Sequence, residues 1–457
     1  MKIIIAGAGE VGRHLAGLLS RRGDDVVLLD RRPAPLALAE EELDVQILAG
    51  DVTFRSVLAR AEVPGSDAFI AVTGSDEANM LAAALARGMG ARIAVARVDQ
   101  PDFYLVGGGL ERDVLGVDHV LCTTRLACAE LLTRIASTQA SFAHSFAAGR
   151  VQVGLWPVAH GDPACAAIPA QLGVREGAVL GGVLRDGFFR RPEEIPRTEE
   201  GDLLLLAGEP EAVDAGARQL VGRRGRDRHL VVGGSELGAL VAGVLAARGL
   251  RVDLIDRDPA RCRELAAELP QVKVLLGDAT DPAFMKDIRF DECEGVVSVT
   301  HQEEVNLLTS MLVRQLDNPA VRGTPHAWVS VHRPGYADIC RRLGIEGTTS
   351  SFEVLSRAIL EAVAPPGIVA SEALPDSAWS VVDARLAPAL VPGLTVADLP
   401  LPGGAVPLAI GRGTASLTPR PERELAGGDN LILACPTREL RSLSTALRGV
   451  AAGEARP

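Results

Sequence analysis

The first thirty residues constrain the fold of this chain more than any other segment. Residues 3–6 are an apolar run too short for a helix, and residues 7–12 read Gly-Ala-Gly-Glu-Val-Gly. A helical pattern of apolar residues follows, and a second apolar run ends in Asp30. A strand, a glycine turn, a helix and a strand that ends in an acid are typical of a dinucleotide-binding βαβ unit. The segment therefore predicts a Rossmann-like, doubly wound parallel sheet of the α/β class.

The spacing of the glycines indicates a phosphate site. The first glycine permits a tight turn, the second lets the backbone approach a pyrophosphate, and the third lets the helix pack closely. The free amides and positive dipole end of the helix favour phosphate. The acid after the second strand is placed to bind both ribose hydroxyls and would repel a 2′-phosphate, so NAD or ATP fits better than NADP. The alternative is a glycine turn without a ligand; we expect nucleotide contacts at Gly7, Ala8, Gly9, Glu10, Val11, Gly12 and Asp30.

Further candidates follow the next apolar strands. Asp51 comes after residues 45–50, Thr73 and Gly74 end another strand run, and Arg97 closes residues 93–97. A doubly wound sheet binds ligands at the carboxyl ends of its strands, where these residues are expected. Taken alone, Asp51 is also compatible with a plain turn residue and Thr73 with a helix-entry residue.

The whole unit recurs later in the chain. Residues 233–238 read Gly-Gly-Ser-Glu-Leu-Gly, and both Gly233 and Asp256 follow their counterparts by 226 residues. The acid and threonine after the next strands recur after 227 residues, so one insertion explains the difference. Chance glycine turns would not keep this register, and the sequence therefore predicts a duplicated nucleotide-binding domain. The second set of candidates is Gly233, Gly234, Ser235, Glu236, Leu237, Gly238, Asp256, Asp278 and Thr300.

The second copy departs from the first at two positions. Ser235 replaces the middle glycine, so its Cβ is expected to hold the backbone away from a pyrophosphate, although its hydroxyl could donate to phosphate. Aligning Pro334 with Pro101 puts Ser330 opposite Arg97, which removes a cationic contact. We therefore expect the first site to bind better, and the second to be weak or to prefer another adenine nucleotide.

Each copy is followed by a helical stretch and then by short strands. A Gly-Asp pair precedes an apolar strand in both halves, at residues 201–202 and 428–429, which indicates a second repeated module of mixed α/β type. Residues 222–228, rich in Arg and Gly, read as a linker between halves. The predicted domains are two Rossmann-like domains with helical crossovers, 1–145 and 226–365, and two small β-rich domains, 146–225 and 366–457 with the tail.

Composition excludes several classes of protein. The 457 residues include 59 acidic and 47 basic side chains, so no basic excess exists to hold nucleic acid or anionic lipid. No apolar run approaches the roughly 20 residues needed to cross a bilayer, and no leader segment is visible. Seven scattered cysteines without a CxxC pair read as core residues of a reduced cytosolic protein, and we expect no metal site.

A soluble NAD-dependent oxidoreductase is the rival interpretation. It would share the first thirty residues but would also need an acid–base pair beside the nicotinamide. His119, His301 and His332 are the candidates, and His301 corresponds to Gly74 in the first copy. A shared catalytic mechanism would not tolerate that difference, so we interpret these histidines as surface residues and expect no catalytic residues.

Together, the two GxGxxG-type units, the acids after the second strands, the GDVT and GDAT runs and the repeated VTxxxExN pattern carry a resemblance. They resemble the regulator-of-K⁺-conductance (RCK) family. The two-copy arrangement without a membrane segment is similar to its branch of NAD-binding regulatory subunits of bacterial Trk potassium uptake systems.

The resemblance implies a non-enzymatic, cytosolic subunit at the inner face of the plasma membrane. It implies a homo-oligomeric ring, tetrameric in the family, beneath an integral-membrane potassium-translocating partner that the ring gates when NAD(H), ATP or ADP binds. It also implies that both glycine turns, the acids after them and the Thr73 and Arg97 positions are nucleotide contacts. The small modules would be RCK C-terminal domains.

Overall fold

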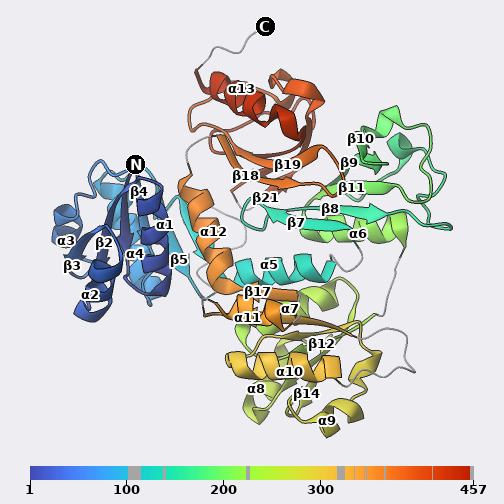
Figure 1. Ribbon diagram of the computed structural model, residues 1–457, viewed down its shortest axis with the longest axis horizontal. Coiled ribbons are helices and arrows are strands. Elements are labelled where there is room, and N and C mark those ends of the chain that lie inside the picture. The colour runs from blue at the N-terminus through green and yellow to red at the C-terminus, as the bar shows by residue number, and fades with distance from the viewer. Residues whose placement is uncertain are drawn as a thin grey trace. The chain divides into compact units, whose positions relative to one another are not determined.

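The computed structural model describes residues 1–100, 115–136, 140–222, 227–315, 325–333, 335–343, 345, 347–364, 367–413 and 415–452. Contacts divide the chain into two compact units (Figure 1). The first contains residues 1–127, 331–336 and 350–364, and the second contains the remainder. The two prolines aligned above, at 101 and 334, and most of the predicted linker lie outside the described residues.

The first unit is built on a six-stranded parallel sheet in the order β3-β2-β1-β4-β5-β6. This order confirms the doubly wound sheet predicted from the glycine turn. Its strands are β1 (Lys2–Ala6), β2 (Asp25–Asp30), β3 (Gln46–Ala49), β4 (Ala68–Ala71), β5 (Ala94–Val98) and β6 (His119–Cys122). The central strands are buried on both faces, which explains why their sequences are continuous apolar runs.

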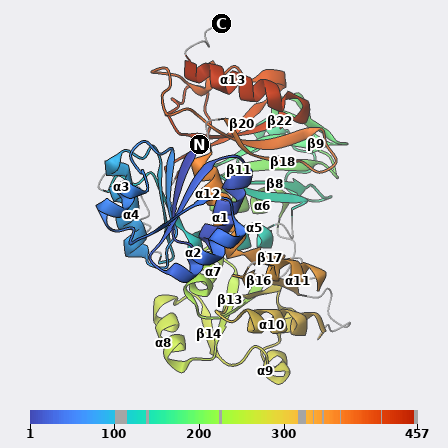
Figure 2. The same cartoon turned by 60° about the vertical axis from the view of Figure 1, so that its left-hand side comes forward.

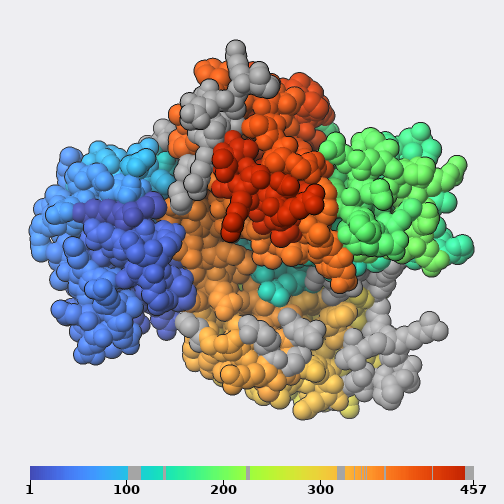
Figure 3. All heavy atoms as spheres, turned by 45° about the horizontal axis from the view of Figure 1, so that its top comes forward, coloured from blue at the N-terminus to red at the C-terminus, as the bar shows by residue number. Residues whose placement is uncertain are grey.

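Helices cover both faces of this sheet. Figure 2 shows α1 and α2 on one face and α3 and α4 on the other, as right-handed crossovers require. The helices are α1 (Glu10–Arg21), α2 (Pro33–Glu42), α3 (Arg55–Arg60) and α4 (Asp76–Met89). The α4 helix begins after Ser75, whose hydroxyl accepts a hydrogen bond from the Ala78 amide at 3.2 Å. In the space-filling view these N-terminal elements, drawn in blue, form one solid body (Figure 3).

The second unit contains a parallel sheet of the same order, β14-β13-β12-β15-β16-β17. The predicted duplication is therefore confirmed. Its strands are β12 (Arg228–Val232), β13 (Arg251–Asp256), β14 (Lys273–Leu276), β15 (Gly295–Ser298), β16 (His326–Val331) and β17 (Gly347–Ser350). The helices are α7 (Glu236–Ala247), α8 (Pro259–Glu268), α9 (Pro282–Asp287), α10 (Glu303–Gln315) and α11 (Tyr336–Arg342).

One boundary predicted for the linker is wrong. Arg228 was placed in the linker at residues 222–228, but it is the first residue of β12. Its guanidinium pairs with the carboxylate of Asp253 on the neighbouring strand at 2.6 Å. The arginines of this segment suggested a solvated linker, but Arg228 forms an ion pair within the sheet.

Two five-stranded antiparallel sheets form the small modules of the second unit, in the orders β10-β9-β11-β8-β7 and β18-β19-β22-β20-β21. The first has β7 (Phe142–Phe146), β8 (Val151–Pro157), β9 (Ala178–Arg185), β10 (Phe188–Arg190), β11 (Leu203–Gly208) and α6 (Pro210–Val221). The second has β18 (Gly367–Ala373), β19 (Trp379–Arg385), β20 (Val406–Arg412), β21 (Ala415–Leu417), β22 (Asn430–Pro436) and α13 (Leu440–Ala452).

The repeated Gly-Asp turn has the same structural role in both small modules. Arg185 donates two hydrogen bonds to the Asp202 carboxylate, at 2.7 and 2.8 Å. Arg412 holds Asp429 in the same bidentate way, at 2.9 and 2.7 Å. Each buried aspartate thereby ties the turn before the central strand to a neighbouring strand.

The two antiparallel sheets share one hydrophobic core, which includes Leu155 and Leu205 from the first and Ile432 from the second. One buried carboxylate also lies at this junction. Asp383 accepts hydrogen bonds from the Ala147 amide at 3.0 Å and from the Asn430 side chain at 2.7 Å. Burial raises the pKa of Asp383 despite these donors.

The two helices that follow the parallel sheets belong mainly to different units. Most of α5 (Thr123–Ala136), which follows the first sheet, belongs to the second unit, from Cys128 onward. The α12 helix (Ser351–Val363), which follows the second sheet, belongs to the first unit. There the Phe352 ring packs edge-on against His14 of α1, with ring centroids 4.8 Å apart.

Two further observations concern the whole described chain. None of its described helices is both long and apolar enough to cross a membrane. The seven cysteines are all unbridged; Cys165 and Cys262 are half-buried and the other five are buried, which agrees with the predicted core role.

Candidate nucleotide site

The first glycine turn has the geometry that its sequence predicts. Gly7 has a φ of +112°, and a Cβ there would lie 2.8 Å from the Val72 carbonyl oxygen. A Cβ on Gly12 would come within 1.8 Å of the Gly7 carbonyl oxygen. Neither position can hold a larger residue, because the start of α1 packs directly against the turn.

Asp30 fixes this turn from the end of β2. Its carboxylate is 7% exposed and accepts hydrogen bonds from the amides of Ala8 and Arg32, both at 2.8 Å. Burial alone would raise the pKa of Asp30, but these donors and the Arg32 side chain outweigh it, so the pKa lies below its usual range. The acid therefore remains charged at neutral pH at the edge of the turn.

The N-terminus of α1 carries no side-chain cap. Gly9 occupies the N-cap position, and no side chain accepts a hydrogen bond from the first turn. A Cβ at Gly9 would meet no atom within 4 Å, so the space in front of the helix is open. The amides of this first turn are available to an anion.

A buried asparagine holds the next two strand ends together. Asn79 of α4 accepts from the amide and hydroxyl of Thr73, at 2.8 and 2.7 Å. It donates to the carbonyls of Thr73 and Arg97, at 3.1 and 3.0 Å. Asn79 was not among the predicted site residues, although its place in the repeated VTxxxExN pattern was the available signal. Its role is to position two candidate contacts.

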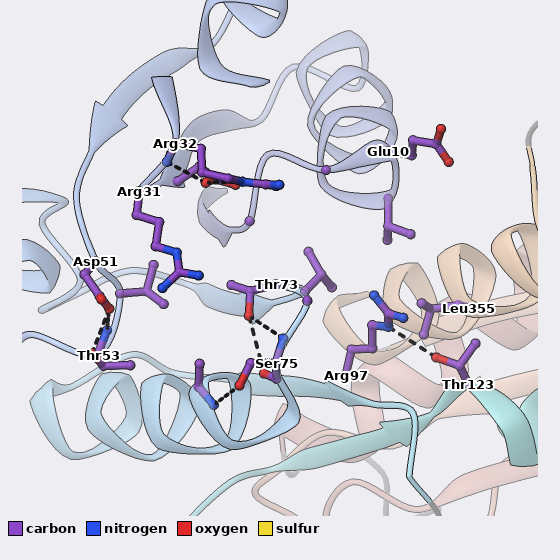
Figure 4. A pocket seen from close by; sticks show the side chains of 18 of the residues that line it. Glu10, Arg31, Arg32, Asp51, Thr53, Thr73, Ser75, Arg97, Thr123 and Leu355 are labelled. Atoms are coloured by element: carbon purple, nitrogen blue, oxygen red, sulfur yellow. Dashed lines mark hydrogen bonds and ion pairs between the residues drawn. The ribbon is translucent and has the colours of Figure 1, made fainter. Parts of the chain in front are cut away.

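These elements enclose a cavity of about 590 Å³ within the first unit (Figure 4). The volume lies in the usual range for small-molecule sites. Of the residues predicted in the first copy, the cavity is lined by Gly7, Gly9, Glu10, Val11, Asp30, Asp51, Thr73, Gly74 and Arg97. Ala8 and Gly12 are buried behind this wall. Asp51 lines the cavity and also accepts from the amide and hydroxyl of Thr53, at 3.0 and 2.7 Å, so its turn role and its cavity position coexist.

Several lining residues were missed by sequence reasoning. Arg31 and Arg32 follow Asp30 directly and lie at its end of the cavity (Figure 4). Thr123 lies at the opposite end, beside the Arg97 side chain that donates to it at 3.3 Å. Ser351, Phe352 and Leu355 come from the second half of the sequence, and nothing local in the sequence marks them. His332 also lines the cavity, and the sequence offered it only as a catalytic candidate of the rival interpretation.

The second glycine turn repeats the scaffold of the first. Gly233 has a φ of +108°, and a Cβ on Gly238 would lie 1.9 Å from the Gly233 carbonyl oxygen. Asp256 accepts from the Gly234 amide at 2.6 Å. Thr300 and Asn306 form the same hydrogen bonds as Thr73 and Asn79.

Two further strand-end predictions can be placed in this second copy. Asn306 donates to the carbonyl of Ser330 at 3.1 Å, as Asn79 does to Arg97, so the predicted correspondence of Ser330 and Arg97 is confirmed. Asp278 accepts from the Thr280 amide and hydroxyl, at 2.8 and 2.7 Å, which is the turn made by Asp51 in the first copy.

The second turn is closed by its own side chains. Ser235 has an extended backbone like Gly9, but its hydroxyl accepts from the Gly238 amide at 3.1 Å and donates to the Val299 carbonyl at 2.8 Å. The expectation that this hydroxyl could donate to phosphate is therefore wrong in this structure, because its proton is already used. Arg261 of α8 donates to the Gly234 carbonyl at 2.8 Å, as Arg13 of α1 does to the corresponding Ala8 carbonyl at 2.8 Å, so the Ser235 cap is what distinguishes the second turn. Glu236 and Leu237 form the first turn of the capped helix.

The comparison with known proteins agrees with this duplicated geometry. The model of the TrkA-N domain matches residues 3–123 and again residues 229–351, which together are more than half of the chain. The chain belongs to the TrkA-N family. Both matched regions begin in the strand before a glycine turn, so the family assignment covers both copies.

Relatives of this TrkA-N chain match along nearly its whole length. A Trk system potassium uptake protein TrkA homolog from Archaeoglobus fulgidus is 28% identical over 98% of this chain and 100% of that protein. Trk system potassium uptake protein TrkA from Vibrio alginolyticus is 25% identical over 95% of each chain.

Solved structures with the same fold include the GsuK RCK domain. It matches with a TM-score of 0.54 and 22% identity over 98% of this chain and 95% of that one. A GsuK channel bound to NAD matches with a TM-score of 0.55 over 98% of this chain and 79% of that one. These neighbours confirm the fold: RCK-type Rossmann domains, each followed by a small antiparallel module.

The three histidines considered as catalytic candidates differ in whether they line the first cavity. His301 is exposed beside Thr300, and His119 is half-buried in β6. Only His332, among these three, lines the cavity.

Proposed function

We propose that this TrkA-N protein is a nucleotide-sensing regulatory subunit of a potassium uptake transporter. Its first Rossmann domain binds NAD or NADH, and ATP or ADP at the same place. The observation that carries the proposal is the cavity in front of the uncapped α1 helix, with Asp30 at one end and Arg97 at the other. Full-length similarity to Trk potassium uptake proteins supports the transport role.

The residues present fit an adenine dinucleotide. The uncapped amides of α1 would hold a pyrophosphate, and the Asp30 carboxylate faces the position of an adenosine ribose. A charged acid at this position, whose pKa is already low, disfavours the 2′-phosphate of NADP. Arg31 and Arg97 lie at the two ends of the cavity (Figure 4), and the Arg97 guanidinium is paired there with the Asp99 carboxylate. We assign all the residues proposed for the first copy, from Gly7 to Arg97, to this nucleotide site.

The second copy is proposed as the weaker site. Gly233 to Gly238, Asp256, Asp278 and Thr300 keep the same backbone arrangement, but the Ser235 hydroxyl occupies the Gly238 amide and donates its own proton to the Val299 carbonyl. Any ligand there must displace a helix cap first. We therefore assign the main sensing role to the first copy.

The proposed mechanism is conformational. Subunits assemble into a ring, taken as a tetramer, at the inner face of the membrane beneath an integral-membrane potassium-translocating partner. A nucleotide changes the state of the ring only if it binds the two states with different affinity. The domain boundaries proposed from the sequence, 1–145, 146–225, 226–365 and 366–457, define the parts that would move.

A soluble NAD-dependent oxidoreductase is the second candidate, because His332 lines the cavity. A histidine there could act as a proton donor beside a nicotinamide. A hydride-transfer enzyme would consume NADH in the presence of its substrate and would lose that activity in His332→Gln. A regulatory subunit would bind NADH without turnover and would keep its affinity in the same variant.

The first test is calorimetric titration of the purified chain with NADH, NAD, ATP and ADP, with absorbance followed for turnover. We expect one strong site per chain and no chemistry. The transport role is then tested by potassium uptake in cells that lack their own Trk regulatory subunit and carry the chain with its native membrane partner. Nucleotide-dependent uptake that is lost in Asp30→Ala supports the proposal; uptake independent of the chain rejects it.

A further inference from the structure

The wall of the first cavity opposite Asp30 comes from the second half of the chain. Ser351, Phe352 and Leu355 occupy the first two turns of α12, and all three line the cavity although they are otherwise buried. Leu355 and Thr123 lie at the same end as Arg97, and Arg31 and Asp51 lie at the other (Figure 4). The two ends therefore differ in chemistry as well as in origin.

This arrangement sets which part of a ligand reaches which wall. With the adenosine ribose at Asp30 and the pyrophosphate at the α1 amides, the rest of a dinucleotide extends toward Arg97 and α12. A mononucleotide such as ADP ends at its phosphates. Only a ligand with a second base has a second flat ring to place against Phe352 and Leu355.

We infer that α12 is the specificity wall of the first site: Phe352 and Leu355 contact the second base of a dinucleotide, so that NAD fixes α12 and a mononucleotide does not. The inference rests on the proposed function and adds the residues that distinguish the two ligand classes. Ser351 lies beside Phe352 at the same wall.

The position of α12 makes this wall relevant to regulation. Phe352 also packs against His14 of α1, the helix whose N-terminus faces the pyrophosphate position. In the chain α12 directly precedes the small module that begins with β18. A ligand that fixes the first turns of α12 therefore acts on the element that leads from the nucleotide domain into the second antiparallel module.

The test compares NAD with ADP-ribose, which lacks only the nicotinamide base. For the wild-type chain we expect NAD to bind about tenfold more tightly, the size typical of one base stacked on an aromatic side chain. In Phe352→Ala and Leu355→Ala most of this ratio should disappear, while the affinity for ADP stays within about twofold. The measured quantity is the ratio of the NAD and ADP-ribose affinities of one variant. A general loss of folded protein affects both ligands alike and leaves this ratio unchanged.

Val354→Ala is the matched control, because Val354 is buried on the same helix but does not line the cavity. It should leave the ratio unchanged. Hydrogen exchange supplies a second measurement: NAD should slow exchange in residues 352–363, and ADP should not.

The outcomes separate the two proposals. If the wild-type chain binds neither NAD nor ADP, the proposed function fails. If it binds both, but Phe352→Ala leaves the NAD to ADP-ribose ratio unchanged or ADP slows exchange in α12 as strongly as NAD, the specificity wall is rejected and the nucleotide site stands.

Discussion

The two glycine turns of this chain have the same backbone and opposite surroundings. In both, the first glycine has a positive φ near 110° and the last packs against its carbonyl oxygen. In the first, α1 begins without a side-chain cap and faces a cavity; in the second, Ser235 caps α7. Backbone geometry is therefore a property of the fold, whereas the availability of the phosphate site depends on a few side chains.

The largest expected difference between the copies concerns their acids. Asp30→Ala removes the acceptor for the Ala8 and Arg32 amides and for a ribose, so NADH affinity should fall about 10- to 100-fold, from a loss of roughly 1.5–3 kcal/mol. Asp256→Ala should change it less than about twofold. Calorimetric titration measures both. Asp67→Ala, which alters an acid at the amino ends of the central strands β1 and β4, is the control; the reverse order for Asp30 and Asp256 would contradict the ranking.

A second prediction tests whether the scaffolds are equivalent. Asn79→Ala and Asn306→Ala each remove a buried side chain with the same set of hydrogen bonds, so each should destabilise its domain by about 2 kcal/mol. Differential scanning calorimetry of the full chain would show a lowered transition of similar size in both variants. A large difference between them would mean that the copies differ in their scaffold as well as in their side chains.

A third prediction converts the first turn into the second. Gly9→Ser adds a Cβ where no atom lies within 4 Å, so the domain should fold. The new hydroxyl should cap α1 as Ser235 caps α7, and NADH affinity should fall about tenfold, the effect of losing roughly 1.4 kcal/mol. Titration with unchanged affinity and an intact melting transition would show that the cap does not exclude the ligand.

The smallest expected effect comes from the reverse conversion. Ser235→Gly should free the Gly238 amide of α7 and strengthen nucleotide binding at the second turn, by about fivefold if one cap of roughly 1 kcal/mol is removed. The number of nucleotides bound per chain at high concentration is the measurement. Arg261→Ala is the control: it removes a hydrogen bond to a carbonyl, which a phosphate cannot use, and should not strengthen binding. An unchanged number in Ser235→Gly would mean that the second copy lacks more than a free amide.

The sequence predicted both parallel sheets and their duplication because these depend on local spacing. Glycine turns, buried strands and terminal acids lie within thirty residues of one another, and their register repeats. It also predicted nine of the 22 residues that line the first cavity, from Gly7 to Arg97. Arg31 and Arg32 are direct neighbours of Asp30 in the sequence, but they were not among the predicted site residues.

What could not be predicted depends on contacts between distant segments or on side-chain rotamers. Phe352 and Leu355 reach the first cavity across more than two hundred residues of sequence, and no periodicity encodes that. The direction of the Ser235 hydroxyl depends on its rotamer and on a carbonyl at Val299. The hydrogen bond from Arg261 to the Gly234 carbonyl depends on how α8 packs against the glycine turn.

The division of α5 and α12 between the two units has a consequence for how such a chain can diverge. In each half, the helix that follows the parallel sheet belongs mostly to the unit that contains the other half's parallel sheet. A domain-swapped dimer exchanges identical elements between two chains in the same way, and here one chain contains both halves. Fusion keeps the partner segment at high effective concentration, so neither copy has to remain self-complementary. Mutations can then block the nucleotide site of one half, while the site of the other half keeps a cavity wall that comes from the mutated half.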